Sequence, residues 1–102
     1  MREYLRCFCC TGTIRAVCED YRAAADIDLE MDQADDDAGR KITAPLHLLW
    51  GAKGAVGQLW DMMATWRGKA AGPVTGRAID CGHLLPEERP EEVLAELLQF
   101  FR

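Results

Sequence analysis

His83 has the clearest potential for chemistry, because it follows directly on a predicted strand. The stretch from Pro73 to Asp80 has the pattern of a strand, and Cys81 and Gly82 separate it from the histidine. Open α/β sheets bind their ligands at the carboxyl ends of parallel strands, and an imidazole in that place can act as a general base near neutral pH. The spacing alone equally allows a histidine that only caps or covers a surface loop. The other histidine, His47, lies inside an apolar run and is expected to pack rather than to catalyse.

The clustered cysteines are a second candidate site. Cys7, Cys9 and Cys10 could bind a metal, but zinc requires about four ligands in paired spacing, and the nearest histidine is His47. The chain has five cysteines, and this odd number argues against a disulfide framework. We therefore interpret them as reduced thiols that fill small apolar gaps, and we predict no metal site.

A glycine-rich loop at 51–57 (GAKGAVG) is a third candidate site. Together with Asp80 near the end of the next strand, it loosely resembles a dinucleotide site, in which glycines contact a pyrophosphate and an acid binds the ribose. The spacing is GxxGxxG rather than GxGxxG, so a flexible connection between strand and helix is the favoured interpretation. The chain also contains no G-x-S-x-G elbow, so it offers a base without a nucleophile.

The composition limits the partners. The 102 residues include 12 basic and 17 acidic side chains, giving a net charge of −5. Such a chain has no overall attraction to phosphate backbones or anionic lipid, so we expect no nucleic-acid or membrane partner. No apolar run approaches the roughly 20 residues that span a bilayer. Since the sequence shows no secretory signal, we expect a cytoplasmic location.

The elements that must position these residues are predicted from hydrophobic spacing. A short helix is expected over 2–9, and two consecutive helices with a bend near Ala24 are expected to end at Gly39. A nearly continuous apolar run over 46–50 predicts a strand buried on both faces. A helix over 59–66, a strand over 73–80 and a last helix that begins at Pro90 complete the order.

The alternation of strands and helices predicts parallel pairing of the two strands. Two parallel strands are too few to form a stable sheet, because such sheets need neighbours on both edges and cover on both faces. The expected fold class is therefore α/β with an incomplete sheet. We expect the chain to be the end of a larger α/β protein.

Three segments together resemble a known family, the haloacetate dehalogenases of the α/β-hydrolase fold, and the fluoroacetate dehalogenases most closely. They are Cys18–Ala24 (CEDYRAA), Pro45–Gly54 (PLHLLWGAKG) and Cys81–Glu88 (CGHLLPEE). The last segment is shared with related epoxide hydrolases, whereas the first favours the dehalogenases. The resemblance implies that 1–40 form the end of the helical cap and that 41–102 form the C-terminal βαβα part of the hydrolase core.

The resemblance also implies roles for two residues. In that family an aspartate displaces halide from a haloacetate and becomes an ester, and a histidine after the last strand activates the water that hydrolyses this ester. His83 matches the histidine. Tyr21 matches a cap tyrosine that helps to bind the departing halide, and a phenolic O–H is a suitable donor to fluoride. The implied substrate is a small haloacid, and no metal or organic cofactor is implied.

Other residues that the family needs have no match in this chain. The nucleophilic aspartate, the arginines that hold the carboxylate and the acid that orients the histidine are expected upstream, so we expect this chain alone to be inactive. Many α/β hydrolases place the orienting acid in the loop where Lys53 and Gly54 stand here. Their presence agrees with the dehalogenase habit of placing the acid one strand earlier. The resemblance is also compatible with a homodimer of the full-length protein.

Three alternatives remain open. The chain could belong to another α/β hydrolase, such as an epoxide hydrolase. It could be a truncated product without catalytic activity that persists by associating with a partner, because an exposed sheet edge and apolar faces favour association. The weakest alternative is a module that binds a dinucleotide.

Overall fold

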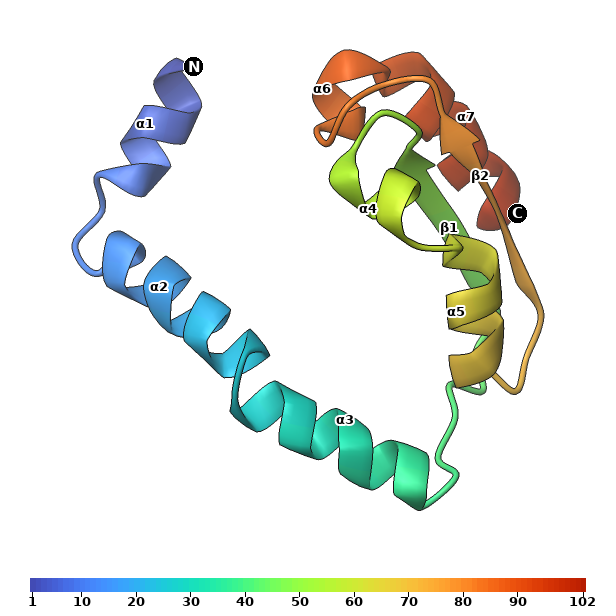
Figure 1. Ribbon diagram of the computed structural model, residues 1–102. Helices are drawn as coiled ribbons and strands as arrows, with labels where there is room; N and C mark the ends of the chain where they lie inside the picture. Colours follow the sequence, from blue (N-terminus) through green and yellow to red (C-terminus); the bar gives the residue numbers. More distant parts are fainter. The chain divides into compact units, whose positions relative to one another are not determined.

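The computed structural model describes residues 1–102, which divide into two compact units, Met1–Arg40 and Lys41–Arg102 (Figure 1). The first unit contains only helices, and the second contains both strands. Tyr21 belongs to the helical unit and His83 to the α/β unit, so each is described within its own unit.

The helical unit consists of three helices in sequence. They are α1 (Arg2–Phe8), α2 (Thr13–Ala24) and α3 (Ile27–Asp37). The break between α2 and α3 confirms the predicted bend. The predicted stop is also confirmed, because Gly39 has a φ of 64° and its amide donates to the Asp36 carbonyl at 2.9 Å. A left-handed residue just after a helix is the usual way to end it.

The α/β unit contains the two predicted strands and the helices around them. Its elements are β1 (Leu46–Gly51), α4 (Ala55–Leu59), α5 (Met62–Lys69), β2 (Val74–Ile79), α6 (Leu85–Glu88) and α7 (Pro90–Phe100). The strands pair in parallel, in a register that runs from Leu46 opposite Val74 to Gly51 opposite Ile79. This arrangement confirms the predicted parallel pair, and it brings the carboxyl ends of both strands to one edge.

The boundaries of two segments in this unit differ from the sequence-based expectation. The helix expected over 59–66 is divided, because α4 ends at Leu59 and α5 begins after Asp61. The Asp61 carboxylate accepts a hydrogen bond from the Ala64 amide at 2.9 Å, and this cap starts a new helix. The loop expected over 51–57 is shorter, since α4 already begins at Ala55.

Little of the chain is buried. Ile79 and Cys81, at the end of β2 and just beyond it, are the only buried apolar side chains, while those of α7 such as Leu94 and Leu98 are more than half exposed. The sheet has two strands and no further neighbour. This confirms that the chain holds an incomplete α/β sheet. None of the helices is both long and apolar enough to cross a bilayer.

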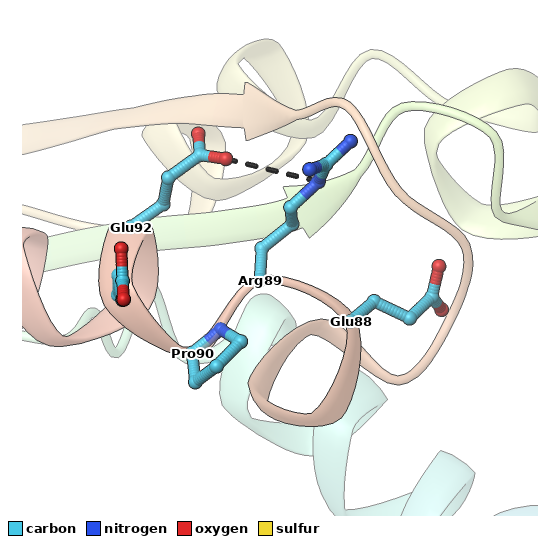
Figure 2. A pocket seen from close by; sticks show the side chains of 5 residues that line it. Glu88, Arg89, Pro90 and Glu92 are labelled. Carbon is cyan, nitrogen blue, oxygen red and sulfur yellow. Dashed lines mark ion pairs between the residues drawn. The ribbon is translucent and has the colours of Figure 1, made fainter.

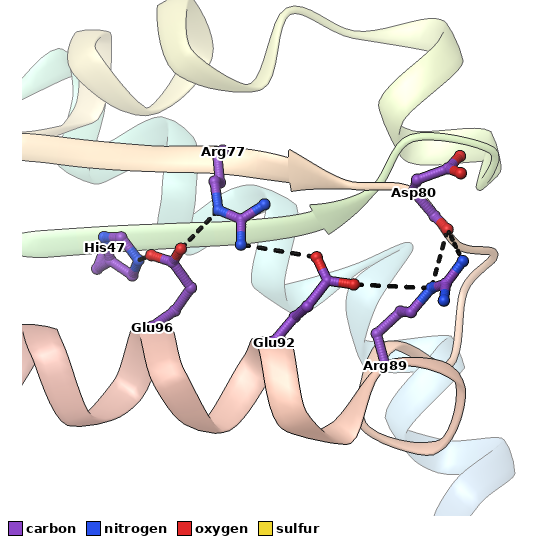
Figure 3. Close-up of polar contacts among 6 residues, drawn as sticks. All are labelled: His47, Arg77, Asp80, Arg89, Glu92 and Glu96. Atoms are coloured by element: carbon purple, nitrogen blue, oxygen red, sulfur yellow. Dashed lines mark hydrogen bonds and ion pairs between the residues drawn. The ribbon is translucent and has the colours of Figure 1, made fainter.

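A polar network joins α7 to the two strands (Figure 3). His47 on β1 contacts Thr75 Oγ1 through Nδ1 at 2.9 Å and Glu96 Oε2 through Nε2 at 3.0 Å. Its ring also stacks on Phe100, with 5.3 Å between ring centroids. From β2, Arg77 Nε donates to Glu96 Oε1 at 2.5 Å. These contacts place His47 in the packing between sheet and helix, as its position in the apolar run indicated.

This network makes the stability of the α/β unit depend on pH. The pKa of Glu96 is held below its usual 4.5, chiefly because Arg77 donates a hydrogen bond to the carboxylate, although burial opposes this effect. A group with a lowered folded pKa stabilises the fold above its unfolded pKa, and this stabilisation is lost as the pH falls through the folded value.

We therefore expect the urea midpoint to fall on acidification from about pH 7 to about pH 3, and to fall less in Glu96→Gln than in the unaltered protein. Glu91→Gln is the matched control, because Glu91 lies exposed on the same helix. Equal acid sensitivity in the unaltered protein and in Glu96→Gln would contradict the assignment.

Candidate active site

His83 lies in the turn between β2 and α6, four residues after the last residue of β2. Its side chain is exposed and makes no hydrogen bond or ion pair with any other residue of the chain. Because β1 and β2 are parallel, the turn after β2 lies at the carboxyl edge of the sheet, where the sequence predicts His83 to be. An imidazole with both ring nitrogens free can accept a proton from a bound water.

The backbone of this turn is fixed against the end of β1. The amide of Ala52 donates to the Ile79 carbonyl at 2.8 Å, and the amide of Lys53 donates to the Cys81 carbonyl at 3.0 Å. Gly51 lies so close to the turn that a Cβ built on it would stand 1.7 Å from the Gly82 carbonyl oxygen. The loops after the two strands are thus bonded together beside His83.

Glu88, at the end of α6, holds the same turn from its other side. Its carboxylate accepts hydrogen bonds from the amides of Gly82 at 2.8 Å and Leu84 at 3.3 Å, the two neighbours of His83. Figure 2 shows the Glu88 side chain directed away from Arg89 and Pro90, toward this turn. No role for Glu88 is predicted from the sequence. The one feature that could have indicated it is an acidic side chain a few residues after a turn whose backbone amides need acceptors.

Asp80 and Arg89 add two further contacts at the end of β2. Asp80 forms an ion pair with Lys53 at 2.8 Å, and the Arg89 guanidinium donates to the Asp80 carbonyl through Nε and a terminal nitrogen, both at 3.3 Å. The Lys53 hydrogen bond and charge lower the pKa of the Asp80 carboxyl. Since this carboxylate already faces a lysine, the geometry does not favour the dinucleotide hypothesis.

Cys81 lies beside the catalytic candidate but does not have the character of a nucleophile. It is buried, and burial raises the pKa of its thiol, with the negative charge of Glu88 adding to the effect. A thiol in such surroundings stays protonated and unreactive. Its environment fits the structural role predicted for the cysteines.

An open pocket lies at the junction of α6 and α7 (Figure 2). It is lined by Glu88, Arg89, Pro90, Glu91 and Glu92, and His83 is not among these residues. Three carboxylates against one guanidinium give it an acidic character, which disfavours an anionic substrate. This pocket is therefore not the site at which a haloacid would be expected to bind.

The remaining candidates lie on the helical unit. Tyr21 lies on α2 with 76% of its surface exposed, so its hydroxyl is free to meet a ligand and its ring is not part of a core in this chain. The clustered cysteines Cys7, Cys9 and Cys10 are also exposed, so they do not fill apolar gaps as the sequence suggested. No group of three or more potential ligand side chains is close enough together to hold a metal ion.

Comparison with known proteins gives relatives over nearly the whole chain. A soluble epoxide hydrolase from Corynebacterium sp. (strain C12) is 33% identical over 100 residues, covering 97% of this chain. A fluoroacetate dehalogenase from Burkholderia sp. is 27% identical over 100 residues, covering 98% of this chain. In each case the matched region is 32% of the relative, so the chain spans about a third of their length. No protein-family model matches the sequence.

Solved structures also match nearly the whole chain. A provisionally assigned α/β hydrolase from Nostoc sp. PCC 7120 has a TM-score of 0.88 and 49% identity, over 98% of this chain and 33% of that one. A provisionally named acyltransferase from Salmonella enterica has a TM-score of 0.87 and 50% identity, over 98% of this chain and 32% of its own. Cfl2 from Burkholderia cenocepacia has a TM-score of 0.80 and 31% identity, over 99% of this chain and 33% of its own.

These matches show the fold of part of an α/β hydrolase. The chain has the fold of the C-terminal part of that architecture, with two parallel strands and their flanking helices, as the sequence predicted. The relatives include both a dehalogenase and an epoxide hydrolase, so they support the hydrolase class and leave the substrate to be proposed.

Proposed function

We propose that this chain carries the general base of a hydrolase that cleaves the carbon–halogen bond of a haloacetate through an ester on the enzyme. The observation that carries the proposal is His83, a free imidazole on a firmly bonded turn at the carboxyl edge of two parallel strands. The segments that resemble haloacetate dehalogenases, and the identity to a fluoroacetate dehalogenase, support this substrate class.

The proposed chemistry has two steps. A carboxylate outside these residues attacks the α-carbon of the haloacetate, forms a C–O bond and releases halide. Water then attacks the carbonyl carbon of the resulting ester while His83 takes a proton from that water. The tetrahedral intermediate collapses with cleavage of the acyl C–O bond, and the leaving alkoxide takes up a proton to give glycolate.

Tyr21 is proposed to donate a hydrogen bond to the departing halide. Its exposed side chain is available for this contact, and its surrounding sequence, CEDYRAA, carries the resemblance to dehalogenases. Fluoride is small and strongly hydrated, so its departure depends more on hydrogen bonds than that of chloride. The tyrosine is therefore expected to matter most for fluoroacetate.

Epoxide hydrolysis is a second candidate function, supported by the 33% identity to a soluble epoxide hydrolase. A carboxylate that opens an epoxide also forms an ester, and a histidine can activate water against that ester in the same way. The difference lies in the first step, because epoxide opening releases no halide.

The substrate can be tested with the protein at its natural length. We expect it to release fluoride and glycolate in equal amounts from fluoroacetate, as measured with a fluoride electrode and by chromatography. Tyr21→Phe is expected to lower fluoroacetate turnover by about 10²-fold and chloroacetate turnover less. Diol formation from styrene oxide without halide release from either haloacetate would favour the epoxide hydrolase. No turnover of any of the three substrates by the folded protein would favour the non-catalytic alternative.

A further inference from the structure

We infer that Glu88 is a positioning residue for His83, holding the catalytic turn through its backbone rather than through the imidazole. The inference rests on the proposed function, in which His83 activates water. It is carried by the two hydrogen bonds that the Glu88 carboxylate accepts from the amides on either side of His83.

The geometry of this contact is that of a two-point clamp. Oε2 accepts from the Gly82 amide at 2.8 Å, and Oε1 accepts from the Leu84 amide at 3.3 Å. A Cβ on Gly82 would stand 2.8 Å from Oε1, so the glycine allows the carboxylate to come this close. Hydrogen bonds to an ionised acceptor are stronger than neutral ones, and a single side chain here fixes both neighbours of the base.

Arg89, the residue after Glu88, contacts the backbone between β2 and His83. The Arg89 guanidinium donates to the Asp80 carbonyl, three residues before His83. The end of α6 therefore bonds to the backbone between β2 and His83 as well as around His83 itself. Since the imidazole has no hydrogen-bond partner in the chain, these backbone contacts are what determine its position.

The position of a general base strongly affects its rate. The base must lie within about 2.6–3.2 Å of the atom whose proton it takes, and a displacement of about 1 Å can cost about 10²-fold. Loss of the clamp should therefore slow hydrolysis of the ester, in which His83 acts. It should leave halide release untouched, because that step uses a carboxylate outside this turn.

The test compares three variants of the natural-length protein with haloacetate as substrate. Glu88→Ala removes both acceptors, Glu88→Gln keeps one carbonyl oxygen as an acceptor, and the exposed Glu91→Ala is the matched control. In Glu88→Ala we expect kcat to fall by about 10- to 100-fold and KM to fall in parallel. Because only the second step slows, kcat/KM should stay unchanged, and the initial burst of halide should be as large as in the unaltered enzyme or larger. Glu88→Gln should be intermediate, and Glu91→Ala should resemble the unaltered enzyme.

A structural defect would look different, because partial unfolding lowers kcat/KM and the size of the halide burst. Amide spectra give a readout that is independent of activity. The Gly82 and Leu84 amide protons should change their chemical shifts in Glu88→Ala, which removes their acceptor, and should keep them in Glu91→Ala. Unchanged steady-state kinetics in Glu88→Ala, or a reduced burst with an unchanged second step, would overturn the inference. Failure of the proposed function itself is distinguishable, since His83→Gln would then not trap an ester.

Discussion

Replacement of His83 by glutamine is expected to stop the natural-length protein after about one turnover on fluoroacetate. Halide release in the first step does not use the imidazole, so the variant should release a burst of fluoride close to one equivalent per active site. Hydrolysis of the ester then lacks its base, and steady-state turnover should fall by about 10²- to 10⁴-fold. Glutamine is chosen because it fills a similar volume in the exposed turn without accepting a proton from water.

The trapped ester gives this prediction a direct measurement. Mass spectrometry of the digested variant should find a carboxymethyl ester on a carboxylate outside residues 1–102. His47→Gln is the matched control, because His47 is the other histidine of the chain and its ring is engaged with Thr75, Glu96 and Phe100. This control should turn over continuously. Sustained fluoride release by His83→Gln at the rate of the unaltered enzyme would remove the histidine from the mechanism.

The sequence predicted the α/β unit well where the signals are local. The apolar run of β1, which ends in a glycine, and the start of α7 at Pro90 both depend on a few adjacent residues, and both elements appear where expected. The two strands pair in parallel, as strand–helix alternation requires. His83 could be placed for the same reason, because a residue just beyond the end of a parallel strand must lie at the carboxyl edge of the sheet.

The missed features depend on contacts between segments. Glu87 and Glu88 are equivalent in sequence, and only the path of the turn makes the carboxylate of Glu88 reach the amides of Gly82 and Leu84. The division between α4 and α5 depends on Asp61, whose capping competes with an apolar spacing that continues through it. The role of Tyr21 comes from the resemblance alone, because the position of its exposed ring on α2 does not by itself indicate a halide site.

Gly51→Ala is expected to destabilise the protein strongly. The new Cβ would stand 1.7 Å from the Gly82 carbonyl oxygen and 2.9 Å from the Cys81 carbonyl oxygen. Both contacts are with backbone, so no side-chain rotation relieves them, and either the end of β1 or the His83 turn must move. Overpacking of this kind costs about 3 kcal/mol, which should appear as a large drop in the urea midpoint of the natural-length protein.

Gly68→Ala is the matched control, because Gly68 lies in α5 and a Cβ there meets nothing within 4 Å. Alanine is the better helix former, so this variant should gain about 0.5–1 kcal/mol. Equal midpoints for the two variants would show that the strand end and the turn are not in contact. Because the displaced carbonyl belongs to the residue before His83, the folded fraction of Gly51→Ala should release halide normally and hydrolyse the ester slowly. Loss of halide release as well would mean that the first step also depends on the end of β1.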